Sequence, residues 1–110
     1  MFSVDGTNIT LTRGDSLYLT INISQNGESY IPQDGDVIRF AMKRKYKDPD
    51  DQVLINKVIP NDTLVLRLEP SDTKSLDIGK TYDYDIELTN SYGDVDTFII
   101  GTLKITKEVL

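Results

Sequence analysis

The chain has 110 residues, a formal net charge of −6 at pH 7, no cysteine and no histidine. Its length fits a single domain, residues 1–110. A folded chain of this size buries roughly 65% of its extended surface, so it can form a sizeable core without disulfides or bound metals. The composition excludes disulfides, thiol catalysis and histidine-based catalysis, and the negative charge disfavours binding to nucleic acid or to anionic membranes.

The N-terminal quarter alternates short apolar stretches with turn signals. Phe2–Val4 and Ile9–Thr12 are predicted as two short strands, joined by a turn at residues 5–8. Leu17 to Ser24 alternates apolar and polar residues and is predicted as one long strand. The Asn26-Gly27 pair that follows favours a tight hairpin.

The middle of the chain continues the pattern. An irregular connection is expected over residues 29–36, followed by a strand from Val37 to Lys45 with its apolar residues on one face. An exposed loop over residues 46–51 leads to a strand at Gln52–Ile59. A further strand is predicted at Thr63–Glu69.

The clearest strand lies near residues 80–89, where apolar and acidic side chains alternate. Successive side chains of a strand point to opposite faces, so the apolar row is expected in the core and the acidic row at the other face. The apolar row consists of Tyr82, Tyr84, Ile86 and Leu88, and the acidic row consists of Asp83, Asp85 and Glu87.

The segment before this strand is predicted to cross between two layers. Pro70 cannot donate to a sheet ladder and should end the preceding strand, and a short helical turn is expected near residues 71–77, capped by Ser71 or Asp72 without a full capping box. Leu76 is expected to pack into the core. Gly79 is expected to adopt a positive φ, which would let the chain turn into the next strand.

Val95 to Thr106 is predicted as the last strand, with a bulge or bend at Gly101. About seven or eight strands with short turns and almost no helix indicate an all-β, immunoglobulin-like antiparallel β-sandwich with Greek-key connections. A small barrel is the alternative. The crossing before Tyr82 and Tyr84 resembles the tyrosine corner of such sandwiches. The predicted structural core residues of this region are Leu66, Leu76, Gly79, Tyr82, Tyr84, Ile86 and Leu88.

The acidic row invites a metal or catalytic interpretation, but a structural one is favoured. In an immunoglobulin-like layout the row lies beside Arg39, Lys43 and Lys45, and each opposite-charge pair across the ladder contributes roughly 0.2–1 kcal/mol. Repulsion between carboxylates about 7 Å apart in water is only about 0.6 kcal/mol. The other acidic clusters, residues 48–51 and 34–36, lack the spacing of a calcium loop. We therefore expect no metal, no cofactor, no catalytic residue and no enzymatic activity.

Two further features concern contacts with partners. Tyr46 and Tyr92 lie outside the predicted core rows, and exposed tyrosines serve protein contacts or stack on sugars. Phe2, Val4 and Ile9 belong to the terminal strands, which are easily added to or exchanged between chains. These five residues form the candidate interaction surface.

From Pro70 onward the sequence resembles the N-terminal domain of the baseplate upper protein of tailed phages of Gram-positive bacteria. Related domains occur in prophage tail and fibre proteins. Four stretches carry the resemblance, with weaker echoes at residues 13–15 and 34–36: Leu68-Glu69-Pro70-Ser71-Asp72-Thr73, Leu76 with Gly79, Tyr82-Asp83-Tyr84-Asp85-Ile86-Glu87-Leu88, and Gly93-Asp94-Val95-Asp96-Thr97 with Gly101-Thr102-Leu103-Lys104-Ile105.

The resemblance implies a virion structural role, in which the domain docks a fibre or receptor-binding component onto a phage tail or baseplate. Protein partners, or self-association, are then expected. The alternative is an adhesion module that binds a host cell-surface glycan. No apolar run approaches the roughly 20 residues of a membrane span, and the residues after Met1 do not form a signal peptide. We expect a protein made in the bacterial cytoplasm and assembled into a virion.

Overall fold

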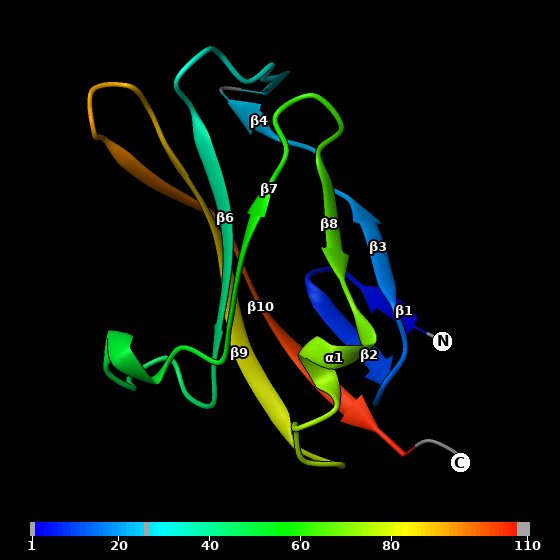
Figure 1. Cartoon of the computed structure of the whole chain (residues 1–110). Helices are drawn as coiled ribbons and strands as arrows, with labels where there is room; N and C mark the ends of the chain where they lie inside the picture. Colours follow the sequence, from blue (N-terminus) through cyan, green and yellow to red (C-terminus); the bar gives the residue numbers. More distant parts are fainter. Residues whose placement is uncertain (1, 26, 108–110) are drawn as a thin grey trace.

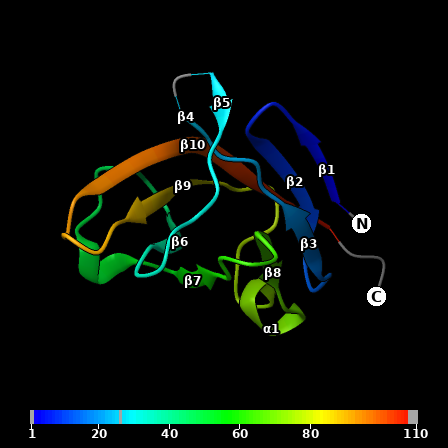
Figure 2. The same ribbon diagram turned by 90° about the horizontal axis from the view of Figure 1, so that it is seen from above.

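Two β-sheets pack face to face in this chain and form an all-β sandwich (Figures 1 and 2). The computed structural model describes the backbone of residues 2–25 and 27–107, and the side chains of residues 6–24 and 27–107. The large sheet has the strand order β1-β2-β10-β9-β6-β7, and the small sheet pairs β3 with β8. The β-sandwich predicted from the spacing of strands and turns is confirmed.

The large sheet is built from three pairs of consecutive strands, and β3 and β8 of the small sheet lie between these pairs in the chain. The β4–β5 hairpin belongs to neither sheet. In order the elements are β1 (Phe2–Asp5), β2 (Asn8–Thr12), β3 (Leu17–Thr20), β4 (Ser24–Gln25), β5 (Glu28–Ser29), β6 (Val37–Lys43), the 3-10 turn η1 (Asp50–Gln52), β7 (Ile55–Ile59), β8 (Val65–Leu68), α1 (Pro70–Thr73), β9 (Thr81–Thr89) and β10 (Val95–Thr106).

Most neighbouring strands run antiparallel, but β10 pairs with β2 in parallel, with Leu103 opposite Ile9 and Ile105 opposite Leu11. Strand β2 is thus paired on both sides, because β1 lies antiparallel along its other edge. The two outermost strands of the large sheet are β1 and β7. The sequence predicted β1 and β2 as an exchangeable edge, and only β1 is one.

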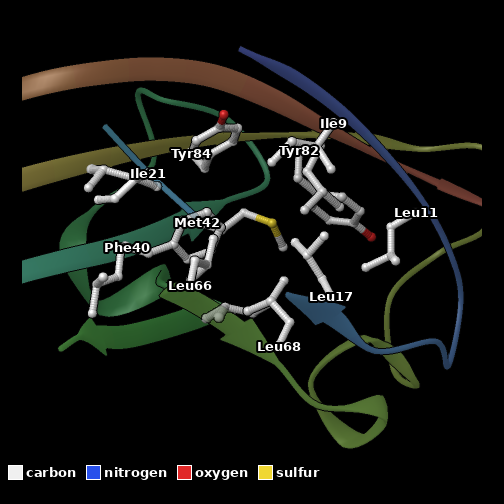
Figure 3. Packing of buried hydrophobic residues seen from close by; sticks show 14 of the residues in the cluster. Ile9, Leu11, Leu17, Ile21, Phe40, Met42, Leu66, Leu68, Tyr82 and Tyr84 are labelled. Carbon is white, nitrogen blue, oxygen red and sulfur yellow. The ribbon is translucent and has the colours of Figure 1, made fainter. Parts of the chain in front are cut away.

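The core fills the space between the sheets, as Figure 3 shows. Alternate residues of β6 and β9 point inward from the large sheet and meet leucines of β3 and β8. The buried apolar residues of the described chain are Ile9, Leu11, Leu17, Ile21, Ile23, Ile38, Phe40, Met42, Ile55, Ile59, Leu66, Leu68, Leu76, Tyr82, Tyr84, Ile86, Leu103 and Ile105.

The predicted strand from Leu17 to Ser24 is shorter than expected. Strand β3 ends at Thr20, although Ile21 and Ile23 continue the apolar alternation and are both buried. Ile21 donates its N–H to the carbonyl of Leu64 at 2.8 Å, so a single backbone bond to the β7–β8 turn takes the place of a regular ladder there. The hairpin that follows pairs Ser24 with Ser29, and Asn26, named in the predicted turn, lies outside the described residues.

The turn between β7 and β8 places one leucine in an unusual backbone conformation. Leu64 has a φ of 55°, in the left-handed region that residues other than glycine, asparagine and aspartate seldom adopt. Its N–H donates to the carbonyl of Pro60 at 2.9 Å, and its side chain packs against the core. The side-chain packing and the two backbone bonds of Leu64 hold the strained turn where the chain passes from the large sheet to the small one.

The crossing from β8 to β9 begins with a single helical turn, α1, which is shorter than the predicted 71–77 segment. Glu69 is its N-cap, and the Asp72 carboxylate accepts the Glu69 N–H at 2.7 Å. The prediction that Ser71 or Asp72 would be the cap was therefore wrong, and so was the prediction that no capping box forms, because the box begins at Glu69. Leu76 is buried after the turn, whereas Gly79 is exposed with a φ of 80°.

The tyrosine corner forms at Tyr82. Its ring is buried, and its hydroxyl accepts the N–H of Asp77 in the crossing at 2.8 Å. The guanidinium of Arg44 lies 5.8 Å from the centre of the Tyr82 ring and forms an ion pair with the Asp77 carboxylate at 3.0 Å. One buried aromatic side chain therefore joins the crossing to the segment that leaves β6.

Tyr84 makes a second long-range connection. Its hydroxyl donates to the carbonyl of Thr7, in the turn between β1 and β2, at 2.6 Å. A Cβ atom at Gly101 would lie 2.0 Å from that carbonyl oxygen and 2.8 Å from the Tyr84 hydroxyl. Gly101 is thus needed for a close backbone approach, and the bulge predicted there lies earlier, between Thr97 and Ile99.

Candidate functional site

The side of the large sheet that faces away from the small sheet carries the charged residues of the central strands. We call this side the outer face; it lies at the left in Figure 1. Arg39 of β6 is directly opposite Glu87 of β9, and Lys43 is directly opposite Asp83. The charge rows predicted from the sequence therefore lie side by side, except that Lys45 falls beyond the end of β6.

The 44–54 loop, which joins β6 to β7, folds over one end of the acidic row. Tyr46 donates its backbone N–H to the Asp83 carboxylate and its hydroxyl to the Asp85 carboxylate, both at 2.9 Å. The bond to Asp85 raises the pKa of the Tyr46 hydroxyl, because ionised Asp85 favours the protonated phenol, and partial burial adds to the shift. The tyrosine side chain stays 47% exposed.

The two cations beside the acidic row contact groups other than that row. The Lys43 ammonium forms an ion pair with Asp50 at 2.8 Å and donates to the carbonyl of Asp48 at 2.9 Å. This contact lowers the pKa of Asp50. Arg39 donates to the side-chain carbonyl of Asn56 at 2.6 Å. The expected cross-strand neighbours are thus present, but Lys43 contacts the 44–54 loop and Arg39 contacts β7.

A hollow of about 320 Å³ lies between the acidic row, the two cations and the 44–54 loop. Its floor is the outer face of β6 and β9, where Ala41 leaves space between larger neighbours. Tyr46 and Val53 form part of the wall. The full lining is Arg39, Ala41, Lys43, Tyr46, Asp50, Val53, Asn56, Asp83, Tyr84, Asp85 and Glu87.

Exposed apolar side chains border the charged centre of the outer face. Val58 of β7 is opposite Arg39, and Ile100 of β10 is opposite Asp85, so each lies on the same face as its charged neighbour. Their exposed fractions are 57% and 58%. Val37 and Val95 flank Thr89 at the far end of the same face and are also exposed. The outer face is therefore a mixed surface of charged and apolar groups.

The structure separates the members of the predicted interaction surface. Tyr46 lines the hollow, whereas Tyr92 is 89% exposed at the tip of the β9–β10 hairpin. Ile9 is 1% exposed, and its prediction as a contact residue was wrong because it faces inward between β1 and β10. Phe2 and Val4 lie in the edge strand β1, and their side chains are outside the described ones.

The predicted core residues mostly lie where the alternation put them. Leu66, Leu76, Tyr82, Tyr84 and Ile86 are buried, and Leu88 is half-buried against the core. Gly79 is exposed, so its assignment to the core was wrong; a glycine that ends a crossing needs conformational freedom and no burial.

Of the lining residues, only Tyr46 was predicted as a contact residue. The charge rows were given a structural role, and Ala41, Val53 and Asn56 were not singled out at all. Asp50, Val53 and Asn56 come from the 44–54 loop and from β7. The sequence marked residues 46–51 as an exposed loop, but it carried no signal that this loop folds back over the sheet. Hydrogen bonds from Tyr46 to two residues that lie 37 and 39 positions away hold it there.

A smaller hollow of about 160 Å³ lies at the other end of the sandwich, beside Tyr30 and Phe98. Near it, the buried carboxylate of Asp36 accepts the Tyr30 hydroxyl at 2.6 Å and the Gln33 N–H at 2.8 Å. The bond to Asp36 raises the pKa of Tyr30. These contacts order the irregular 30–36 connection, which gives Asp36 a structural role.

Residues 2–25 and 27–107 contain no group of three or more acidic side chains arranged to hold a metal ion. No helix in the same described part of the chain is long and apolar enough to cross a membrane.

Comparison with protein-family models gave no match, and a search of curated proteins gave none either.

Proposed function

We propose that this chain is a non-enzymatic assembly module of a phage tail or baseplate, which docks fibre or receptor-binding components through protein contacts. The observation that carries the proposal is the outer face, where exposed apolar residues lie beside a charged hollow on the large sheet. Interfaces combine an apolar contact area with polar groups that fix orientation. The resemblance to a baseplate domain, which includes strand β9 itself, supports the choice of partner.

A second surface supports the same proposal. The large sheet ends in two strands, β1 and β7, that have a neighbour on one side only. An edge strand presents unpaired backbone groups that can receive a strand of another chain. Within the described residues, strand β1 is paired with β2 alone.

Sedimentation of the chain with the proteins encoded beside it tests the proposal. We expect a complex with a tail or baseplate protein, and we expect deletion of Met1–Asp5 to weaken this complex more than it lowers the unfolding midpoint. A chain that remains monomeric and sediments apart from every tail protein would contradict the proposal.

The adhesion alternative is favoured by one observation, the presence of Tyr46 in the wall of the hollow. Sugar sites combine an aromatic side chain with carboxylate and amide groups that bind hydroxyls. On this alternative the chain binds a cell-surface glycan and ignores tail proteins. Binding of the chain to purified cell-wall polysaccharide, lost in Tyr46→Ala and kept in Tyr92→Ala, is its expected signature.

A further inference from the structure

The acidic row has hydrogen-bonding capacity that the described residues leave unused. Asp83 and Asp85 each accept one bond, in both cases through Oδ2 and from Tyr46. Glu87 has no hydrogen bond or ion pair within residues 6–24 and 27–107, although Arg39 is its cross-strand neighbour. Carboxylates in this state can still accept several charge-assisted hydrogen bonds from a ligand.

The charge of the lining is not balanced. Two cations, Arg39 and Lys43, stand against four carboxylates, Asp50, Asp83, Asp85 and Glu87, which gives a net charge of −2. Lys43 already contacts Asp50, and Arg39 contacts Asn56. A ligand that brings positive charge would complement the remaining acids, whereas a neutral sugar would leave the imbalance in place.

We propose that the hollow receives an arginine side chain of the protein partner, whose guanidinium binds the carboxylates of the acidic row beside the Tyr46 ring. A guanidinium is planar, carries five donors and can bind a carboxylate through two parallel bonds. It also binds favourably against a tyrosine ring and is more weakly hydrated than an ammonium group. The apolar residues Val58 and Ile100 lie on either side of the charged rows on the same face and would contact the rest of the partner.

The inference rests on the proposed function only in taking the partner to be a protein. Its chemistry can be tested on the full chain with a small probe, N-acetyl-L-arginine amide, by following backbone amide signals during a titration. We expect saturable shifts at Ala41, Tyr46 and Asp85. N-acetyl-citrulline amide, which has the same shape without the charge, should cause no such shifts.

Two matched variants locate the binding. Glu87→Gln keeps the size of the side chain and removes its charge, and it should weaken binding of the arginine probe about three- to tenfold. Glu28→Gln makes the same change on the exposed β5 strand and should have no effect. Added salt should weaken binding, because the contact is partly exposed.

Three results would overturn the inference. Equal shifts with the arginine and citrulline probes would show that charge is not recognised. Shifts with glucose and none with the arginine probe would assign the hollow to a sugar. Equal binding by Glu87→Gln and the wild-type chain would remove the acidic row from the site.

The two proposals fail separately. If the arginine probe binds but no tail protein does, the hollow is a guanidinium site and the assembly function is wrong. If a tail protein binds the wild-type chain and the Glu87→Gln variant equally well, the assembly function stands and the hollow is not its docking point.

Discussion

The two sides of strand β9 differ in what their side chains contact. On the inner side Tyr82 and Tyr84 are buried, and each hydroxyl bonds to a backbone group from another part of the chain. On the outer side Asp83 and Asp85 bond to one loop residue, Tyr46, and Glu87 has unused acceptors. The inner side stabilises the sandwich, whereas the outer side has capacity left for a partner.

This difference follows from the alternation of a strand together with the cost of burial. A buried hydroxyl needs a partner, so the inner side fixes the positions of Asp77 and Thr7. A half-exposed carboxylate can bond to water, so the outer side tolerates incomplete pairing in the free protein. Substitutions on the two sides should therefore affect different measurements.

The largest expected effect on stability is at the two core tyrosines. Tyr82→Ala and Tyr84→Ala each remove a large buried aromatic ring and should lower the free energy of unfolding by about 3–5 kcal/mol. Chemical denaturation measures this directly. Tyr92→Ala, at the exposed hairpin tip, is the control and should stay within about 0.5 kcal/mol of the wild type. An unchanged midpoint in both core variants would contradict the tyrosine-corner account.

Gly101→Ala comes next. The added Cβ would meet the Thr7 carbonyl oxygen at 2.0 Å, so β2 or β10 must shift, and we expect a loss of about 1–3 kcal/mol. The same denaturation series measures it, and the signals of Thr7 and Tyr84 should move in the amide spectrum. A variant as stable as the wild type would show that the close approach of Thr7 to β10 is not required.

Tyr82→Phe separates the hydroxyl from the ring. It keeps the packing and leaves the Asp77 N–H without its acceptor, so the expected loss is about 1 kcal/mol. Tyr18→Phe, on the half-exposed ring that lies 5.0 Å from the Arg67 guanidinium, removes a hydroxyl outside the core and is the matched control. Equal effects of the two changes would mean that the corner hydrogen bond contributes nothing.

The smallest expected effect is the pH dependence of the outer face. Lys43 lowers the pKa of Asp50 below its ordinary value of 3.8, so the contact is fully present above that value and is lost as the pH falls through the lowered pKa. Carbon-detected titration of Asp50 measures the shift. In Lys43→Met the pKa should return toward its ordinary value; a titration unchanged by this substitution would rule out the ion pair.

Much of the fold could be predicted because burial imposes a simple period on β9. The alternation of tyrosines and acids placed both faces of the strand correctly. The assumed immunoglobulin-like layout placed Arg39 and Lys43 of β6 beside the acidic row, where the structure has them. The sequence does not show that β2 runs parallel to β10, because a parallel pairing between distant segments leaves no local pattern. For the same reason Ile9 was assigned to the surface, although it is buried.

The candidate site was harder to predict than the strand that carries it. Tyr46 was singled out as an exposed aromatic residue, but the hollow depends on how the 44–54 loop folds back, which Tyr46 itself fixes through Asp83 and Asp85. Asn56 and Val53 enter the lining only through that folding. These hydrogen bonds join residues nearly 40 positions apart, so no local sequence pattern predicts them.

The central claim is that the inner side of β9 stabilises the fold and the outer side binds a partner. It is tested most directly by measuring both complex formation and the unfolding midpoint of the same variant. Glu87→Lys reverses a charge on the outer face, and Glu28→Lys makes the same change on the β4–β5 hairpin. Because Glu87 faces Arg39 across the ladder, we predict that Glu87→Lys lowers the free energy of unfolding by no more than about 1–2 kcal/mol but no longer sediments with the tail or baseplate protein. Glu28→Lys should keep both properties. A Glu87→Lys chain that still forms the complex as tightly as the wild type would contradict the assignment of docking to the outer face.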